Sequence, residues 1–580
     1  MYRKSAFWAI GAILLVLTIS IISCAPQASP TPITIVKKET EIVKETQVVV
    51  VTATPAPPPA ETSIAVFTAS QPALHFLGHG GSTGDMTALF LCLHGQLFDL
   101  DPNGNVVPDI VEKYEVSADG LVYTFYLNEK ARWHDGVPVT AADVEFSFVA
   151  YTAARSGSRQ RKEIFGNILG SEEVVASTEK SMSYADSVKF KGIEILDDYT
   201  IRFTMMKPDP LWLTQFGNNP GWFSLLPKHL LEHVPWEKWL EHPLAKTRPI
   251  GCGPYKFVKG IDGQYWELEA FEDYHLGRPK IDRIFFKSWL DVNVATAQLE
   301  SGELDLVLAL NLDDAERLQG KSGIAIASCP ASNAYQLSIR TDRITDKRVR
   351  KAIAYAIDRE AIWKNIFKGL GEIKECCLLQ EWAIPPGQTV LPYDPAKART
   401  LLAEANWDST RVLRVLYPAG YRYADVLLPI IQQQLAEVGI KIEMNPLETT
   451  AFKAALKDPQ AEWDIFYNQS ANMFPDPGSF ALWACGDLQA DIINKGANLS
   501  WIYCDPHWKE LWDRGRSTTD QSERAKIYQE IQSIFYEEMP AVNIVLPSSI
   551  YGLRSRLKGF APTPQVWNSF WNVYSWSVSE

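Results

Sequence analysis

The sequence predicts an α/β protein with two or three domains. Its 580 residues exceed what one hydrophobic core usually supports. From residue 346 onward, helical patterns alternate with short apolar strands, which is typical of α/β architecture with a mostly parallel sheet. The composition is that of a globular protein, with 46% hydrophobic and 22% charged residues. The formal net charge of −13 argues against nucleic acid as a partner, because that affinity depends on Lys and Arg at the phosphates.

The first 24 residues have the pattern of a lipoprotein export signal. Arg3 and Lys4 precede an apolar run over residues 7–22, which is about as long as a signal-peptide core and short for a membrane span. The run ends at Ile21-Ile22-Ser23-Cys24, with a small residue directly before a cysteine. We expect a signal peptide over residues 1–23, lipidation of Cys24, and an exported protein anchored at the outer face of the cytoplasmic membrane. A retained N-terminal anchor helix is the alternative.

Residues 24–62 contain two Pro/Thr/Ala-rich stretches and too little apolar variety to build a core. We expect them to form an extended tether. The globular body then begins with a predicted strand over residues 64–68, the Gly-rich loop 75–85, and a helix over residues 86–93. Residues 80–84 match the G-x-S-x-G pattern of hydrolases, but no acid and His partners for Ser82 stand out downstream. We expect the rim of a ligand cleft here and keep a secreted serine hydrolase as an alternative of a different class.

The run Leu97–Tyr151 is the most informative part of the sequence. Pro108 and Asp109 predict the start of a short helix over residues 110–114, and Asp119-Gly120 predicts a turn. Residues 121–127 alternate in the two-residue period of a half-buried strand. A second turn at 134–136 leads to a helix that Thr140 is expected to cap.

This run resembles the signature region of the peptide/nickel class of extracellular solute-binding proteins, the ligand-capturing components of ABC importers. The residues that carry the resemblance are Asp119-Gly120, Tyr123-Thr124-Phe125, Leu127, His134-Asp135-Gly136, Thr140-Ala141 and Asp143-Val144. Further similar stretches are GCGPYKF at 251–257, whose glycines we expect at a tight backbone crossing, and VRKAIAYAIDREAI at 349–362. The resemblance spans about residues 64–560.

The resemblance implies a two-lobed periplasmic-binding-protein fold of the Venus-flytrap type, with an extra domain inserted in the N-terminal lobe. On this basis we expect lobe I to comprise residues 63–105, 245–335 and 545–580, the inserted subdomain residues 106–244, and lobe II residues 336–544. The implied function is capture of a small solute by hinge closure and its delivery to membrane permease subunits. It requires no enzymatic activity and no cofactor, and we expect a monomer.

The ligand site is expected where a strand of lobe II ends, because ligands of α/β lobes bind at the carboxyl ends of strands and between domains. The strand over residues 463–468 is followed by the loop that we expect to form the cleft wall. Relatives that bind peptides use an Asp a few residues before the Asp-Pro pair to bind the peptide's α-amine. This chain has Asn472, Met473 and Phe474 ahead of Asp476-Pro477, so Asp476 itself would have to substitute.

Aromatic side chains are the second part of the predicted site, because the chain holds 19 Trp residues whose faces stack on peptide side chains and sugar rings alike. We expect ligand contacts from His79, Asp85, Trp222, Trp382, Asn468, Asn472, Asp476, Trp483 and Trp501. A peptide-like solute is the first choice. An oligosaccharide is the alternative, since the amine-pairing Asp is missing. His229 and His233 lie one helical turn apart but lack an acidic partner, so no metal site is expected.

Cysteines give one further expectation. Cys485 and Cys504 bracket a segment that resembles one closed by a disulfide in dipeptide-binding relatives. A bridge closing a loop of about twenty residues would contribute roughly 3 kcal/mol by restricting the unfolded chain. The sequence leaves open the pairing of the others, which are Cys92, Cys252, Cys329, Cys376 and Cys377.

Overall fold

Three β-sheets of seven, five and four strands organise the described part of the chain. The computed structural model describes residues 62–68, 84–153, 162–218, 223–261, 263–288, 291–331, 334–375, 378, 380–421, 423–458, 460–469, 476–479, 503, 505–564 and 569–579. All of them belong to one compact unit, Pro58–Glu580. No helix among these residues combines the length and the apolar character needed to cross a bilayer.

The seven-stranded sheet is assembled from three distant parts of the chain, in the order β12-β18-β11-β1-β10-β9-β8. Strand β1 runs parallel to β10 and β11, and the other neighbours are antiparallel. The strands are β1 (Ser63–Phe67), β8 (Tyr255–Ile261), β9 (Tyr265–Ala270), β10 (Arg283–Lys287), β11 (Leu306–Val307), β12 (Ile324–Pro330) and β18 (Ser548–Arg554). The strand predicted at residues 64–68 is therefore confirmed as β1.

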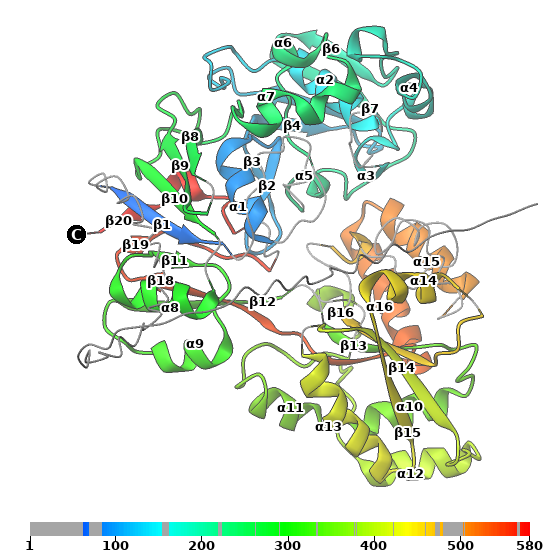
Figure 1. Cartoon of the computed structure of the whole chain (residues 1–580). Coiled ribbons are helices and arrows are strands. Elements are labelled where there is room, and N and C mark those ends of the chain that lie inside the picture. The colour runs from blue at the N-terminus through cyan, green and yellow to red at the C-terminus, as the bar shows by residue number, and fades with distance from the viewer. Residues whose placement is uncertain are drawn as a thin grey trace, which may run out of the picture. The chain divides into compact units, whose positions relative to one another are not determined.

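Helices cover both faces of this sheet. Because side chains alternate along a strand, Ile64 and Val66 of β1 join the apolar cluster of α1, whereas Phe67 joins the cluster of α8 and α9. Figure 1 shows α8 and α9 beside β11 and β18. The helices are α1 (Gly84–Leu93), α8 (Val292–Ser301) and α9 (Leu312–Leu318), and a two-stranded sheet of β19 (Leu557–Lys558) and β20 (Ser577–Val578) follows near the C-terminus.

The four-stranded sheet is antiparallel throughout, in the order β4-β5-β7-β6. Its inner face packs an aromatic cluster in which Phe125 and Phe203 lie 5.0 Å apart between ring centres and Trp212 stacks on Phe125. The sheet and its surroundings comprise β2 (Phe98–Leu100), β3 (Val106–Pro108), β4 (Val111–Val116), β5 (Val122–Leu127), β6 (Ile193–Asp197), β7 (Thr200–Thr204), α2 (Ala141–Thr152), α3 (Lys162–Phe165), α4 (Ser171–Thr178), α5 (Thr214–Asn218), α6 (Lys228–Leu231) and α7 (Pro243–Lys246).

The helix predicted over residues 110–114 is wrong, because this stretch forms strand β4. Asp109 does not cap a helix: its carboxylate accepts hydrogen bonds from the Gln96 N–H, at 2.8 Å, and from the Tyr274 hydroxyl, at 3.2 Å. The chain beyond it pairs with β5 across the turn at Asp119-Gly120. Pairing with a neighbouring strand thus overrides the local helix signal.

The five-stranded sheet has the order β15-β14-β16-β13-β17. Strand β14 is parallel to β15 and β16, but β13 is antiparallel to both β16 and β17. The expectation of a mostly parallel sheet is therefore wrong. Helix–strand alternation produces the parallel pairs of β14, whereas β13 follows directly after β12 of the seven-stranded sheet and β17 leads directly back to β18 of that sheet. The strands are β13 (Tyr335–Ile339), β14 (Val412–Pro418), β15 (Lys441–Leu447), β16 (Ile465–Gln469) and β17 (Ala541–Val545).

Aspartate side chains cap two of the helices around this sheet. Asp358 accepts a hydrogen bond from the Ala361 N–H and Asp394 accepts one from the Lys397 N–H, so both are N-caps. The helices are α10 (Lys347–Ala356), α11 (Arg359–Asn365), α12 (Pro395–Glu404), α13 (Ala424–Glu437), α14 (Thr449–Lys457), α15 (Pro506–Ser517) and α16 (Gln521–Glu538).

Two short segments connect the seven- and five-stranded sheets, one between β12 and β13 and one between β17 and β18. They are joined by a hydrogen bond from the Ala331 N–H to the Pro547 carbonyl, at 2.8 Å. Leu546 also forms an isolated bridge with Glu372. A Cβ on the adjacent Gly371 would lie 2.1 Å from the Leu546 carbonyl oxygen, so only glycine fits there.

A second close approach confirms the crossing predicted for the glycines of residues 251–257. A Cβ on Gly251 would lie 1.9 Å from the Leu93 carbonyl oxygen. His134 of the signature turn fastens this crossing: its Nδ1 accepts the Gly251 N–H at 3.2 Å, and its Nε2 lies 3.1 Å from the Gly253 carbonyl oxygen. These two bonds fix a neutral tautomer, and burial lowers the pKa of His134 to about 4.

Candidate functional site

The candidate site lies at the carboxyl end of strand β16, where the sequence predicts the cleft wall. Asn468 is the penultimate residue of this strand and pairs in register with Gln336 of β13. Its Oδ1 accepts a hydrogen bond from Ser338 Oγ at 3.2 Å, and its Nδ2 donates to the Gln469 carbonyl. Because its side chain is buried and bonded within the sheet, Asn468 stiffens the strand end from which the loop departs.

Beyond that loop, Asp476 is held by Arg524 of helix α16. Asp476 Oδ1 accepts hydrogen bonds from Arg524 Nη2 at 2.7 Å and from the Gly478 N–H at 2.8 Å. Both charged side chains are buried, since Asp476 is 9% and Arg524 is 5% exposed. Arg524 also donates from Nε to the Gly515 carbonyl, at 3.0 Å, so helices α15 and α16 hold the guanidinium from behind.

Two aromatic rings flank the guanidinium of Arg524. Its central carbon lies 5.6 Å from the ring centres of both Trp382 and Tyr528, within the range of cation–π attraction. The two rings meet edge to face, with centres 5.8 Å apart. Burial by itself lowers the pKa of Arg524, and the carboxylate of Asp476 more than offsets this, so the net pKa is raised. Arg524 is thus a permanent positive charge beneath the predicted cleft wall.

The segment at Gly478 also touches residues close to the four-stranded sheet. A Cβ on Gly478 would come within 2.5 Å of Leu211 Cδ1 and 2.7 Å of the Tyr528 hydroxyl oxygen. Asp209, two residues before Leu211, has its pKa raised by burial, and the positive charges of Arg516 and Arg524 oppose that rise. A small residue at 478 is therefore needed for this contact.

The arrangement changes the interpretation of Asp476. Its charge is already balanced by Arg524, so a ligand ammonium group at this point would compete with a buried ion pair. Sequence reasoning missed Arg524 and Tyr528. The partner of Arg524 lies 48 positions away in the chain, and nothing local in the helix pattern singles it out. The contribution of Asp476 to ligand binding stays a prediction.

Only part of the predicted site falls on described residues. Trp382, Asn468 and Asp476 are described, and the structure brings Trp382 and Asp476 together around Arg524. Asp85 is the second residue of helix α1, but its side chain is not described. The other predicted residues lie outside the described residues: His79, Ser82, Trp222, Asn472, Trp483 and Trp501, the lipidation site Cys24, and Cys485 and Cys504 of the expected disulfide.

The described residues contain no group of three His, Cys, Asp or Glu side chains that could hold a metal ion. His229 Nε2 instead lies 2.8 Å from Asp135, and His233 lies beside Glu232. Three cysteines of the described residues are free thiols, namely Cys92, Cys252 and Cys329, and all three are buried.

Known proteins share both the sequence pattern and the fold of this chain. The oligopeptide-binding protein AppA of Bacillus subtilis is 27% identical over 509 residues, which cover 84% of this chain and 86% of that protein. Among solved structures, the ABC transporter substrate-binding protein CtaP of Listeria monocytogenes matches with a TM-score of 0.74 at 24% identity. That match covers 89% of this chain and 99% of the other.

A second solved structure is Bacillus subtilis AppA in complex with a nonapeptide, with a TM-score of 0.67 at 23% identity, covering 90% of this chain and all of that one. These likenesses show the two-lobed periplasmic-binding-protein fold. The model of the bacterial extracellular solute-binding proteins, family 5, matches residues 105–490, which is more than half of the chain. The chain therefore belongs to the family 5 extracellular solute-binding proteins, the peptide/nickel class of ABC importers.

Proposed function

We propose that this chain captures a peptide-like solute between its two lobes and delivers it to the permease of an ABC importer. The observation that carries the proposal is the family match over residues 105–490, together with a relative, matched over 86% of its length, that is named for binding oligopeptides. No step of the function requires a bond to be broken in the solute.

Capture works by hinge closure in this proposal. The connections between the two large sheets are the short segments 331–334 and 546–547, tied by the bond between Ala331 and Pro547. Short paired connections absorb a change of backbone angle while the sheets on either side stay rigid. The closed form is favoured only by the contacts that a solute makes with both lobes at once.

The proposal places the peptide over the Arg524–Asp476 pair and the ring of Trp382. The buried pair stiffens the wall from behind, and the half-buried ring of Trp382 supplies apolar area that accepts side chains of different shapes. Recognition of a peptide would then depend on its backbone and side chains more than on its α-amine, because the negative charge of Asp476 is already matched.

A lipid anchor at Cys24 holds the protein at the membrane in this proposal. The apolar run that ends at Cys24 directs export and lipidation, and residues 24–62 tether the folded unit to the outer face of the cytoplasmic membrane. The permease subunits are partners on that membrane. A lipid anchor keeps the solute-loaded protein close to them, which raises its effective concentration.

Native mass spectrometry of freshly purified protein, followed by a thermal-shift screen, tests the proposal. We expect co-purified peptide masses, and peptides at about a hundredfold excess over Kd should stabilise the fold by about 2.7 kcal/mol. The bound peptides should be recovered intact after incubation. A melt that responds to oligosaccharides and not to peptides would contradict the solute class, and cleaved peptide would contradict a purely binding role.

A further inference from the structure

The four-stranded sheet directly contacts the helical layer of the five-stranded sheet. Its side of the contact is formed by the turn between β4 and β5 and by the segment that follows β7. The other side is formed by the segment after the predicted cleft wall and by the C-terminal end of α15 with the residues that follow it. We call this the cross-sheet contact, and the residues that define it are Gly120, Asp209, Leu211, Gly478, Arg516 and Thr519.

Close packing at the cross-sheet contact excludes water. A Cβ on Gly120 would lie 3.5 Å from Thr519 Cγ2. A Cβ on Gly478 would lie 2.5 Å from Leu211 Cδ1 and 3.2 Å from Arg516 Cγ. Gly120 is buried although it lies in a turn, and Leu211 is 2% exposed. Because burial of apolar area is favourable, the contact stabilises the arrangement in which the two parts meet.

Both sides of the cross-sheet contact are held rigidly by their own elements. The Tyr123 hydroxyl of β5 donates to the Asp209 carbonyl at 2.9 Å, which fixes the segment after β7 to the four-stranded sheet. Arg524 Nε of α16 donates to the Gly515 carbonyl at 3.0 Å, directly before Arg516. The contact therefore separates only if the two parts of the molecule move apart as bodies.

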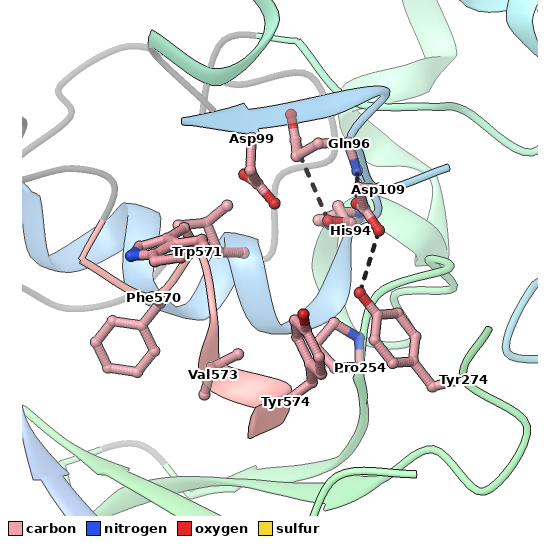
Figure 2. A pocket seen from close by; sticks show the side chains of 11 residues that line it. His94, Gln96, Asp99, Asp109, Pro254, Tyr274, Phe570, Trp571, Val573 and Tyr574 are labelled. Atoms are coloured by element: carbon pink, nitrogen blue, oxygen red, sulfur yellow. Dashed lines mark hydrogen bonds between the residues drawn. The ribbon is translucent and has the colours of Figure 1, made fainter. Parts of the chain in front are cut away.

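The four-stranded sheet is also fastened to the seven-stranded sheet. Asp109, two residues before β4, accepts a hydrogen bond at 3.2 Å from the hydroxyl of Tyr274, which lies beyond β9, and Figure 2 shows this bond. His275 Nε2 lies 2.9 Å from the same carboxylate, and His134 adds a second joint at the glycine crossing. The four-stranded sheet should therefore move with the seven-stranded sheet, so rotation at the connections between the two large sheets would part the cross-sheet contact.

Charge makes this contact more than apolar packing. Burial raises the pKa of Asp209, and the positive charges of Arg516, Lys207 and Arg524 oppose that rise, Arg516 the most. Lys207 lies on the same segment as Asp209, so it stays near the carboxylate when the two parts separate. Arg524 is already bound to Asp476. Arg516 is therefore the charge that Asp209 gains when the contact forms.

We propose that the cross-sheet contact is a latch, in which Asp209 and Arg516 hold the two lobes closed around the solute without touching it. This inference rests on the proposed capture by hinge closure and goes beyond it, because the latch adds contacts between the lobes to those that the solute makes. Asp209 and Arg516 are thus positioning residues. Since their attraction is gained only in the closed form, it raises the affinity for any solute that the closed form holds.

Calorimetric titration of the whole protein with the peptide that co-purifies with it tests the latch. Asp209→Asn removes the charge and keeps a side-chain oxygen that can accept the Leu211 N–H, as Asp209 does at 3.1 Å. Asp209→Asn and Arg516→Gln should each raise the Kd of the peptide by about threefold or more. Arg514 is the matched control, because it is the other basic residue in the last turn of α15 and is exposed. Arg514→Gln should leave the Kd unchanged.

Exchange of the two charges separates attraction from a merely structural effect. Arg516→Asp alone places two negative charges at the contact and should weaken binding more than Arg516→Gln does. The double variant Asp209→Arg with Arg516→Asp should restore the Kd to within about twofold of the unmodified protein. Urea unfolding of each variant shows that it is folded before its Kd is compared.

The outcomes distinguish the latch from hinge closure itself. A raised Kd for the single variants, with recovery in the double variant, supports the latch. A Kd equal to that of Arg514→Gln for both single variants, or a double variant that binds no better than Arg516→Asp, would overturn the latch alone. Small-angle X-ray scattering of the unmodified protein with and without the peptide provides the other test. An unchanged radius of gyration would overturn hinge closure and the latch together.

Discussion

Arg524 of helix α16 donates a hydrogen bond to Asp476 at 2.7 Å, which ties the end of the predicted cleft wall to the helical layer beneath it. The pair is buried between Trp382 and Tyr528. A buried charge is tolerated while its partner is present, and it becomes costly once the partner is removed.

We therefore expect Arg524→Ala to lower the free energy of unfolding by about 3 kcal/mol, because it leaves the Asp476 carboxylate buried and unpaired. Urea unfolding followed by Trp fluorescence measures this. Arg514→Ala is a matched control, because Arg514 is an exposed residue of α15 and should change stability by no more than about 0.5 kcal/mol. Equal effects of the two substitutions on the free energy of unfolding would show that the buried pair does not stabilise the fold.

The same pair predicts how the protein treats peptide termini. Because Arg524 already balances the charge of Asp476, a free α-amine gains little from this carboxylate. N-acetylated peptides should therefore bind with a Kd within about threefold of the Kd of the free peptides. Calorimetric titration of one peptide in both forms gives the ratio. A loss of affinity by a factor of about a hundred on acetylation would mean that a carboxylate in the cleft does bind the amine.

The signature turn should make stability sensitive to acid. The pKa of His134 is lowered to about 4 in the fold by burial, whereas an unfolded His titrates near 6.5. The unfolded chain therefore takes up the proton first, so the contribution of His134 is complete above pH 6.5 and is lost as the pH falls towards 4. The loss should approach about 1.4 kcal/mol per pH unit.

Urea unfolding at pH 7, 6 and 5 measures this slope, and His134→Gln should reduce it. The exposed His233 provides the control, because His233→Gln should leave the slope unchanged. His94 adds a second contribution of the same sign, since burial lowers its pKa to about 3. An identical slope for His134→Gln and the unmodified protein would contradict the assignment.

Anchoring has a direct test in cells. Cys24→Ser removes the only thiol of the predicted processing site, so the variant should leave the membrane fraction and carry no lipid. Fractionation and intact-mass measurement of the purified protein report both properties. Cys92→Ser leaves the processing site intact and should remain membrane-bound. Equal membrane retention of the Cys24 variant would favour an uncleaved anchor helix instead.

Much of the fold follows from local sequence signals. Alternation predicts strand β5, the sequence also predicts strands at β1 and β16, and the side chains of Asp358 and Asp394 cap real helix starts. Strand pairing between distant segments determines the elements that local signals do not predict. Residues 111–116 carry an ambiguous pattern that pairing with β5 resolves as a strand, and the direction of β13 and β17 depends on how the chain passes between sheets.

The candidate site was harder to predict for the same reason. Trp382 is predicted from its aromatic side chain and Asp476 from a family pattern, but the residue that joins them, Arg524, is distant in sequence. Buried polar networks assembled from remote segments are visible only once the fold is known.

Small-angle X-ray scattering of the protein, with and without its co-purified peptide, tests whether two lobes close on a peptide. We expect the radius of gyration to fall when the peptide binds and to return when it is removed, with the peptide recovered unchanged. A radius of gyration that stays constant while the peptide is demonstrably bound would contradict it.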